Sequence, residues 1–375
     1  MDYLEDGDII YRKLQEHLDE MPIGFPRAKS GSDIRFLKYM FTPEEAKIAT
    51  YLRFGWYRDA EPLDQIYERI KDTGITLEEL EGNLDTMARK GSILSKRVEN
   101  KKFFANTALI LGMYEFQANK QTHEFLEVLE EYLGEIWGKE ANKTGYQQMR
   151  YIPVEVDIEP ELNIAPYDNI RKILVECEGP FVKVTCVCRE SQDLLGEPCK
   201  MTKHRDNCLG FGEMAQMYID QGYGVEISKE ETLQILQRNK EEGLILRPSN
   251  SQKVDFVCSC CYCCDGSIAN LQRIPDPGNY VLSNYYSQID PELCTGCGTC
   301  IERCLFKAIT LVDEKCSIEK IKCIGCGNCI SYCPSEAISL HKKEEVNIPP
   351  PTMDDLYDLI YEKKRKVKNN QKKNL

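Results

Sequence analysis

The residues best suited to chemistry in this 375-residue chain are its 19 cysteines. None precedes Cys177, so the chain has a half without thiols and a half that carries them all. Eight of the cysteines form two runs of the same spacing, and the segments that follow, 307–311 and 336–340, also match each other. The two runs are Cys294-x2-Cys297-x2-Cys300-x3-Cys304 and Cys323-x2-Cys326-x2-Cys329-x3-Cys333. This duplication predicts an internal repeat with pseudo-two-fold symmetry.

The spacing within each run suits a [4Fe–4S] cubane, whose iron corners lie only a few ångströms apart. Three cysteines at intervals of three reach three corners from one tight loop, and the fourth ligand comes from elsewhere. Zinc sites usually pair two CxxC knuckles across a longer gap, so the spacing disfavours zinc. Glycines in the loops let backbone N–H groups approach the sulfurs and tune the cluster. They are Gly296, Gly298, Gly325 and Gly327.

Residues 285–342 therefore resemble the bacterial ferredoxin domain with two [4Fe–4S] clusters. The resemblance implies that the fourth cysteine of each run binds the other cluster. One predicted ligand set is Cys294, Cys297, Cys300 and Cys333, and the other is Cys323, Cys326, Cys329 and Cys304. Leu305 departs from the family, which usually has proline after the fourth cysteine, as Pro334 does here. The resemblance also implies low-potential electron transfer between other redox centres.

Nine more cysteines lie between residues 186 and 264, more than packing of small apolar side chains explains. The candidate metal ligands among them are Cys186, Cys188, Cys199, Cys208, Cys258, Cys260 and Cys261. One additional cluster would use Cys188, Cys199, Cys208 and one member of the 258–264 segment. The alternatives are two clusters or a non-cubane cluster with eight or more cysteines, a structural zinc site, or a redox dithiol at a CxxC pair.

The neighbours of these cysteines carry further expectations. A strand would point Cys186 and Cys188 the same way, whereas the adjacent Cys260 and Cys261 should point apart. Arg189 either hydrogen-bonds a cluster sulfur or lies on the surface, and His204 is either a ligand or a solvated loop residue. Two cysteines outside both groups, Cys177 and Cys316, are interpreted as packing residues.

The N-terminal part of the chain follows a helical pattern. Thr42-Pro43-Glu44-Glu45 predicts the start of one helix. Thr76 with Glu79 predicts a capping box for another, which ends at Lys90-Gly91. Two short strands are expected next, at 92–98 and 101–106. Three helices followed by a basic hairpin resemble a winged-helix domain, which implies DNA binding through the third helix. That helix is acidic, and DNA phosphates repel acidic surfaces.

Charge and composition narrow the class of protein. The formal charge of −13 argues against a whole-chain binder of nucleic acid or of anionic membranes. The acidic N-terminus has no signal-peptide pattern. The longest apolar run, 107–114, is too short to span a bilayer. We therefore expect a cytoplasmic protein, in which thiols stay reduced and clustered cysteines bind metal.

Together these observations predict an α+β iron–sulfur protein of anaerobic metabolism. The expected domains are a helical one (1–145), a cysteine-rich metal-binding one (146–284), a ferredoxin one (285–342) and a basic, flexible tail (343–375). No glycine-rich dinucleotide fingerprint or hydrolytic constellation is recognised. We therefore expect an oxidoreductase component that works with redox partner proteins. The rival interpretation is a redox-sensing winged-helix regulator that binds DNA.

Overall fold

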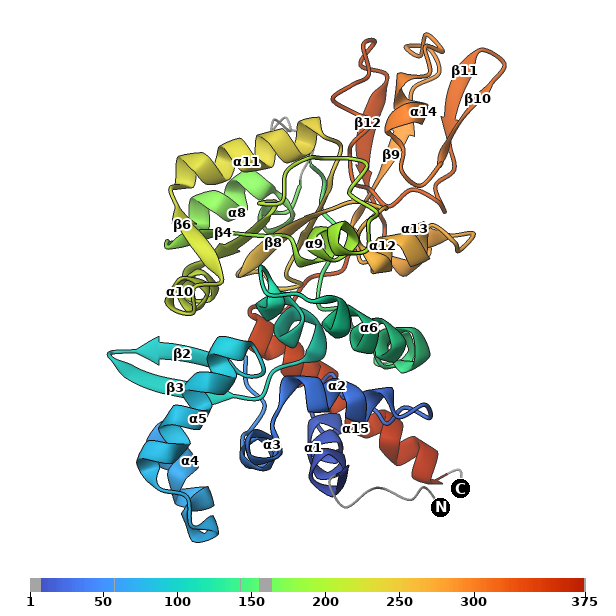
Figure 1. The fold of residues 1–375 in the computed structure, drawn as a ribbon. Helices are drawn as coiled ribbons and strands as arrows, with labels where there is room; N and C mark the ends of the chain where they lie inside the picture. Colours follow the sequence, from blue (N-terminus) through green and yellow to red (C-terminus); the bar gives the residue numbers. More distant parts are fainter. Residues whose placement is uncertain (1–7, 57, 142, 155–163, 374–375) are drawn as a thin grey trace. The chain divides into compact units, whose positions relative to one another are not determined.

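The computed structural model describes residues 8–56, 58–141, 143–154 and 164–373, which form two compact units (Figure 1). The first unit comprises Met1–Gln147, Gln216–Tyr223 and Met353–Leu375, and the second comprises Gln148–Ala215 and Gly224–Thr352. Helices and antiparallel sheets occur in the same chain, which confirms the predicted α+β class. The cysteine-rich and ferredoxin-like segments both lie in the second unit, and their division into two domains stays a prediction.

The first unit is mainly helical. Its helices are α1 (Ile9–Asp19), α2 (Ser32–Met40), α3 (Pro43–Ala49), α4 (Leu63–Ile70), α5 (Leu77–Lys90), α6 (His123–Tyr132), α7 (Gly138–Ala141) and α15 (Met353–Lys373). Its sheet has the order β1-β3-β2, with β1 (Glu61–Pro62), β2 (Leu94–Val98) and β3 (Lys101–Ala105). The capping box expected at Thr76 is present, since its side chain accepts a hydrogen bond from the backbone N–H of Glu79. The helix start expected at Thr42 also forms a capping box, with Glu45.

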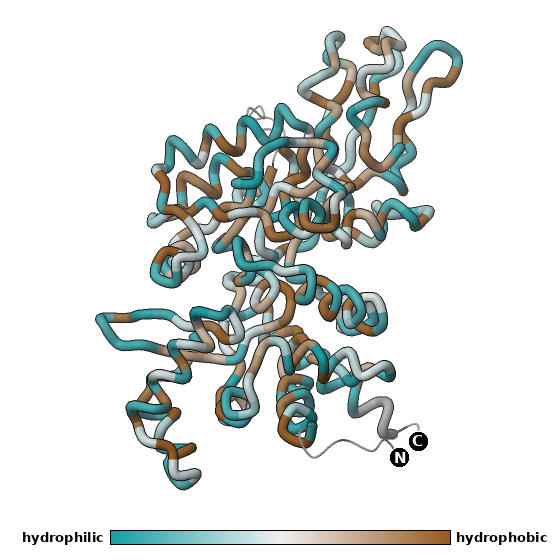
Figure 2. Tube along the Cα trace, viewed as in Figure 1, coloured by the Kyte–Doolittle hydropathy of each residue, from teal (hydrophilic) through white to brown (hydrophobic). Residues whose placement is uncertain are grey.

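The hairpin β2–β3 turns at Glu99 and Asn100, which both have positive φ, as tight two-residue hairpins require. Its sequence is mostly hydrophilic toward the turn (Figure 2). In β3, Lys102 pairs with Glu81 (2.8 Å) and Asp85 (2.6 Å) of α5. Part of the positive charge of the hairpin is therefore neutralised within this unit. The winged-helix resemblance stays a prediction.

The basic C-terminal segment differs from the prediction of a flexible tail. Most of it forms α15, a helix of 21 residues. Lys364 in this helix is only 2% exposed and pairs with Glu140 at 3.1 Å. Its ammonium also donates to the backbone carbonyls of Asp19 (2.7 Å) and Met21 (2.9 Å). The sequence did not reveal this arrangement, because one of the six lysines from residue 363 onward is an internal ion-pair partner rather than a solvated side chain.

The second unit is built on a five-stranded antiparallel sheet of order β6-β4-β5-β8-β7. Its strands are β4 (Phe181–Val184), β5 (Cys208–Phe211), β6 (Gly224–Ile227), β7 (Ile245–Pro248) and β8 (Phe256–Cys260). Helices α8 (Ile170–Glu176) and α11 (Lys229–Glu241) cover one face (Figure 1) and bury Leu209 and Val257 against it. Because side chains alternate along a strand, Cys208 and Cys258 lie on the opposite face.

Four more helices belong wholly or partly to this unit: α9 (Val187–Leu194), α10 (Gly212–Asp220), α12 (Gly266–Leu271) and α13 (Pro277–Tyr280). Ahead of these helices, Ile152 forms an isolated antiparallel bridge with Leu246 of β7. No helix in the described part of the chain is both long and apolar enough to cross a membrane.

The C-terminal part of this unit contains the repeat. Its elements are β9 (Tyr285–Ile289), α14 (Thr299–Arg303), β10 (Ile309–Val312), β11 (Lys315–Ile318) and β12 (Ile338–Lys342). Strand β12 pairs with β9, and β10 pairs with β11. Gly296 and Gly325 occupy equivalent left-handed positions, with φ of 69° and 70°. A Cβ atom at either would collide with a backbone carbonyl, that of Glu314 or of Tyr285, so both loops require glycine.

Candidate metal centres

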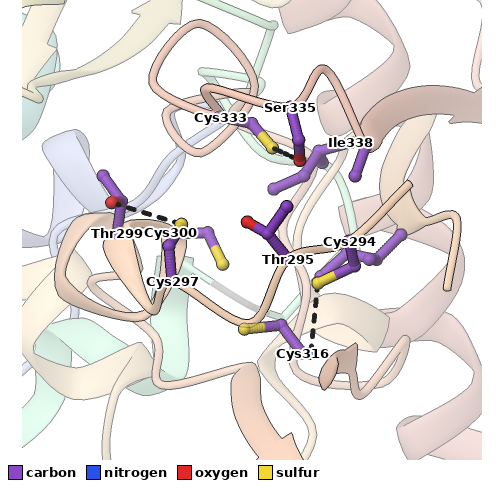
Figure 3. A pocket seen from close by; sticks show the side chains of 11 residues that line it. Cys294, Thr295, Cys297, Thr299, Cys300, Cys316, Cys333, Ser335 and Ile338 are labelled. Carbon is purple, nitrogen blue, oxygen red and sulfur yellow. Dashed lines mark hydrogen bonds between the residues drawn. The ribbon is translucent and has the colours of Figure 1, made fainter. Parts of the chain in front are cut away.

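Cysteines from both runs of the repeat line one cavity of about 280 Å³. Cys294, Cys297 and Cys300 come from the first run, and Cys333 comes from the second (Figure 3). The structure therefore brings together the four thiols of the first predicted ligand set. Cys316 of β11 contributes a fifth thiol to the lining of the same cavity. The sequence analysis interpreted this cysteine as a packing residue and did not expect it beside a cluster site.

A second cavity of about 380 Å³ gathers the other predicted set. Cys323, Cys326 and Cys329 come from the second run and Cys304 comes from the first. Leu305, which stands where the ferredoxin family usually has proline, lines this cavity without displacing Cys304. The backbone N–H of Ala308 donates to Cys304 Sγ at 3.2 Å. Each cavity thus combines three thiols of one run with the last thiol of the other.

Hydrogen bonds to sulfur repeat between the two cavities. The backbone N–H of Cys316 donates to Cys294 Sγ, and that of Ser287 donates to Cys323 Sγ, both at 3.4 Å. The N–H groups of Cys316 and Gly296 lower the pKa of Cys294. The N–H and hydroxyl of Thr299 lower the pKa of Cys297 in the same way. Both effects favour the thiolate, which is the form that binds iron.

Comparison with protein families gives one match, a 4Fe-4S dicluster domain at residues 286–334. This region is a 4Fe-4S dicluster domain. The matched segment covers the eight cysteines of the repeat and ends one residue after Cys333. Searches of curated proteins and of solved structures found no match for the chain.

The dicluster domain holds two [4Fe–4S] clusters. Its two cavities fit that cofactor, because each offers four thiols and backbone N–H donors directed at sulfur. We assign the crossed ligand sets described above to the two cavities as a proposal. Cluster I then denotes the site of Cys294, Cys297, Cys300 and Cys333, and cluster II denotes the site of Cys323, Cys326, Cys329 and Cys304.

Outside the dicluster domain, four thiols converge to within 4.8 Å of one another. This four-thiol group consists of Cys199, Cys261, Cys263 and Cys264. Cys199 Sγ lies 3.6 Å from Cys261 Sγ and 3.8 Å from Cys263 Sγ. Contacts with the other three thiols lower the pKa of Cys199. Four converging thiols are a suitable ligand set for an iron–sulfur cluster or a zinc ion.

The sequence identified this group only in part. Cys199 and Cys261 were candidate ligands, whereas Cys263 and Cys264 were not. Their signal was CxxC spacing, which relates Cys263 to Cys260 and Cys264 to Cys261. Of the other candidates, Cys188 packs against the four-thiol group without joining it, and Cys208 lies on β5. The set of Cys188, Cys199 and Cys208 is therefore not one convergent group.

Four remaining candidates, Cys186, Cys208, Cys258 and Cys260, lie at the end of the central sheet. Cys208 and Cys258 are direct partners in the pairing of β5 with β8. As expected, Cys260 and Cys261 point apart, since Cys260 packs in another apolar cluster than Cys261. The strand expected at Cys186 and Cys188 is absent, because Cys186 is the N-cap of α9.

The structure distinguishes between the alternative positions that the sequence left open for Arg189 and His204. Arg189 is only 1% exposed, which excludes the surface position. Burial lowers the pKa of its guanidinium, but the nearby thiols of Cys186, Cys261 and Cys208 outweigh burial and raise it. His204 is 47% exposed and faces the carboxylates of Asp206 and Glu242, as a solvated loop residue does.

Cys177 fits its predicted role. It is partly buried against the core under α8 and its thiol donates weakly to the carbonyl of Val254 at 3.8 Å. Burial raises its pKa to about 11, so this thiol stays protonated at neutral pH. A protonated thiol in an apolar contact is a packing residue rather than a metal ligand.

Proposed function

We propose that the protein transfers low-potential electrons between redox partner proteins and a further centre in its own cysteine-rich segment. The observation that most directly supports this proposal is that the dicluster domain and the four-thiol group lie in one compact unit. Each bound [4Fe–4S] cluster carries one electron at low potential. We propose that the four-thiol group holds the third iron–sulfur centre, and that the chain works as a component of a cytoplasmic, anaerobic oxidoreductase.

The packing between the two cysteine-rich parts supports this proposal. Cys326 of the dicluster domain and Cys258 and Cys260 of the central sheet contact the same apolar cluster. Its buried members include Tyr151, Ile245, Ile268, Val281, Phe306 and Ile324. These side chains exclude water and pack the end of β8, which leads directly into Cys261, against the dicluster domain. A rigid connection of this kind keeps the reorganisation that accompanies electron movement small.

The test is a reductive titration of the anaerobically purified protein, followed by EPR spectroscopy. We expect reversible low-potential signals from the dicluster domain and a separate signal that the double variant Cys199→Ser/Cys263→Ser lacks. Cys177→Ser is the matched control, since it removes a thiol that belongs to neither group. A zinc ion in the four-thiol group, or an iron signal there that no electron from the dicluster domain reduces, would contradict the proposal.

A further inference from the structure

A second group of thiols lies beside the four-thiol group, and the sheet register creates it. Cys208 of β5 lies directly opposite Cys258 of β8, and Val184 of β4 lies opposite Cys208 on its other side. Cys260 follows Cys258 by two residues and Cys186 follows Val184 by two. Side chains two residues apart on a strand share a face, so Cys208, Cys258 and Cys260 approach the same end of the sheet. Cys186 lies just beyond β4, at the N-cap of α9, and its thiol reaches that of Cys208 there. We name Cys186, Cys208, Cys258 and Cys260 the sheet-end group.

The thiols of the sheet-end group face one another. The thiol of Cys186 contacts those of Cys188, which lies beside the group, and of Cys208. The thiol of Cys258 contacts those of Cys208 and Cys260. None of these cysteines forms a disulfide, and none is exposed. Isolated buried thiols are ordinary packing residues, whereas four thiols directed at one another are an arrangement typical of metal ligands.

Two buried arginines point to negative charge at this place. Arg189 is 1% exposed and Arg247 is 8% exposed. Nε and Nη1 of Arg189, and Nε of Arg247, find no hydrogen-bond partner among the described residues. Arg247 pairs with Cys258 in the sheet register, and Asp265 is its ion-pair partner at 2.8 Å. Unpaired buried guanidinium N–H groups are costly, and a thiolate-bound cluster supplies both the charge and the acceptors they lack.

We propose that the sheet-end group binds a fourth iron–sulfur cluster, separate from the centre of the four-thiol group. Soft thiolate ligands select iron–sulfur clusters or zinc. The choice of iron rests on the proposed electron-transfer function. Cys258 and Cys260 contact the apolar cluster that also contains Cys326 of the dicluster domain. Arg189 faces Cys186 of the sheet-end group and both Cys199 and Cys261 of the four-thiol group. The sheet-end group is thus linked on both sides to thiols that the proposed function uses, and a redox-inert metal there would serve no transfer.

The test is metal analysis of the full chain purified without oxygen. We expect about sixteen irons and about sixteen sulfides per chain, because each cubane contains four of each. The double variant Cys208→Ser/Cys258→Ser should lose about four irons and four sulfides, and Cys199→Ser/Cys263→Ser should lose another four of each. Cys177→Ser should lose none. Because two strand substitutions can disturb the sheet, Cys186→Ser is the second variant, since serine is also a good N-cap.

Each outcome decides the proposal. Loss of four irons from Cys186→Ser or Cys208→Ser/Cys258→Ser, with the dicluster EPR signals retained, supports it. Loss of one zinc instead of iron, or no loss of metal, overturns it. Loss of the same eight irons in variants of either group reveals one shared cluster and also overturns it. Loss of zinc from Cys199→Ser/Cys263→Ser alone would contradict the proposed function and leave this inference standing, because the sheet-end variants report only the metal of their own group.

Discussion

At the scale of single residues, Cys316 and Ser287 occupy equivalent positions of the repeat and touch different clusters. The thiol of Cys316 contacts Cys294 and Cys300 at cluster I, whereas the hydroxyl of Ser287 lies 3.6 Å from Cys329 Sγ at cluster II. A hydroxyl is a stronger hydrogen-bond donor than a thiol. A donor to a cluster sulfur stabilises the reduced, more negative state and so raises the reduction potential.

The variant Cys316→Ser should therefore raise the potential of cluster I. A hydrogen bond worth about 1 kcal/mol more in the reduced state corresponds to about 40 mV for one electron. EPR-monitored redox titration measures the shift. The matched variant Ser287→Ala should lower the potential of cluster II instead. A shift of both clusters together, or of neither, would show that these side chains do not set the difference between them.

The crossed ligand sets give a second prediction. The double variant Cys297→Ala/Cys333→Ala should destroy one cluster and leave about four irons in the dicluster domain, because both residues belong to cluster I. The variant Cys297→Ala/Cys304→Ala should damage both clusters, although its residues come from the same run. Iron analysis and the number of EPR signals distinguish the two variants. The reverse pattern would mean that each run binds its own cluster.

The two kinds of cysteine motif were not equally predictable. The eight cysteines of the dicluster domain follow from local spacing, since three ligands of each cluster lie within one loop. The central cysteines depend on the register of β5 with β8, two strands separated by 50 residues of chain between Cys208 and Cys258. Spacing alone therefore combined Cys199 with Cys208, which the structure places in different groups. The burial of Arg189, whose Nη2 donates to the carbonyl of Ser259 in β8, also had no local signal.

At the scale of elements, α15 is attached to the first unit through Lys364. Replacing this lysine with alanine would leave the buried carboxylate of Glu140 without one of its cationic partners. It would also remove the donor to the carbonyls of Asp19 and Met21. Breaking a buried ion pair in this way costs about 3–5 kcal/mol. We expect Lys364→Ala to lower the free energy of unfolding of this unit by that amount.

Urea denaturation followed by circular dichroism measures this effect. Lys368→Ala is the control, because Lys368 forms only an exposed pair with Glu20 at 3.2 Å. An exposed pair contributes at most about 1 kcal/mol. Equal effects of the two substitutions would show that Lys364 is not an internal anchor, and that the basic segment behaves as the solvated tail expected from its charge.

The charges on the hairpin β2–β3 and on α5 bear on the rival interpretation, in which the protein is a DNA-binding regulator. Lys102 is already paired with Glu81 and Asp85, and α5 carries further acidic residues in its first turn. We therefore expect duplex DNA to bind no tighter than non-specifically, with a Kd above about 10⁻⁶ M at physiological salt. Fluorescence anisotropy with the oxidised and the reduced protein tests this expectation. Tighter binding that changes with redox state and that Lys101→Ala weakens would favour the regulator.

At the scale of the whole molecule, the division into two units departs from the linear order of the chain. Residues 216–223 and the C-terminal helix belong to the first unit, although the cysteine-rich segments lie between them and the N-terminal helices. Tyr218 and Tyr223 pack on Phe116, and Tyr223 donates a hydrogen bond to the carbonyl of Ala88. Composition can suggest only domains that are consecutive segments of the chain. The return of residues 216–223 to the first unit depends on aromatic packing between residues about a hundred positions apart, which composition does not reveal.

All 19 cysteines lie in the second unit, so removal of metal should affect the stability of that unit. Without metal, its interior contains gathered thiols and the buried guanidinium of Arg189, whose Nε and Nη1 have no hydrogen-bond partner among the described residues. Metal binding to such sites contributes directly to folding free energy, about 10 kcal/mol or more for small thiolate domains. The first unit contains no cysteine, and its stability rests on helix packing and on pairs such as Lys364 with Glu140.

We therefore expect chelation of the metals under reducing conditions to loosen the second unit selectively. Hydrogen–deuterium exchange should accelerate in β5, β8 and the dicluster domain by at least tenfold, while exchange in α1, α5 and α6 stays within twofold of the untreated protein. Mass spectrometry of peptides from both units, with and without metal, measures the difference, and reconstitution with iron and sulfide should restore protection. Uniform acceleration in both units would mean that they unfold as one cooperative body, and unchanged exchange in β5 and β8 would mean that the central thiols hold no metal that stabilises the sheet.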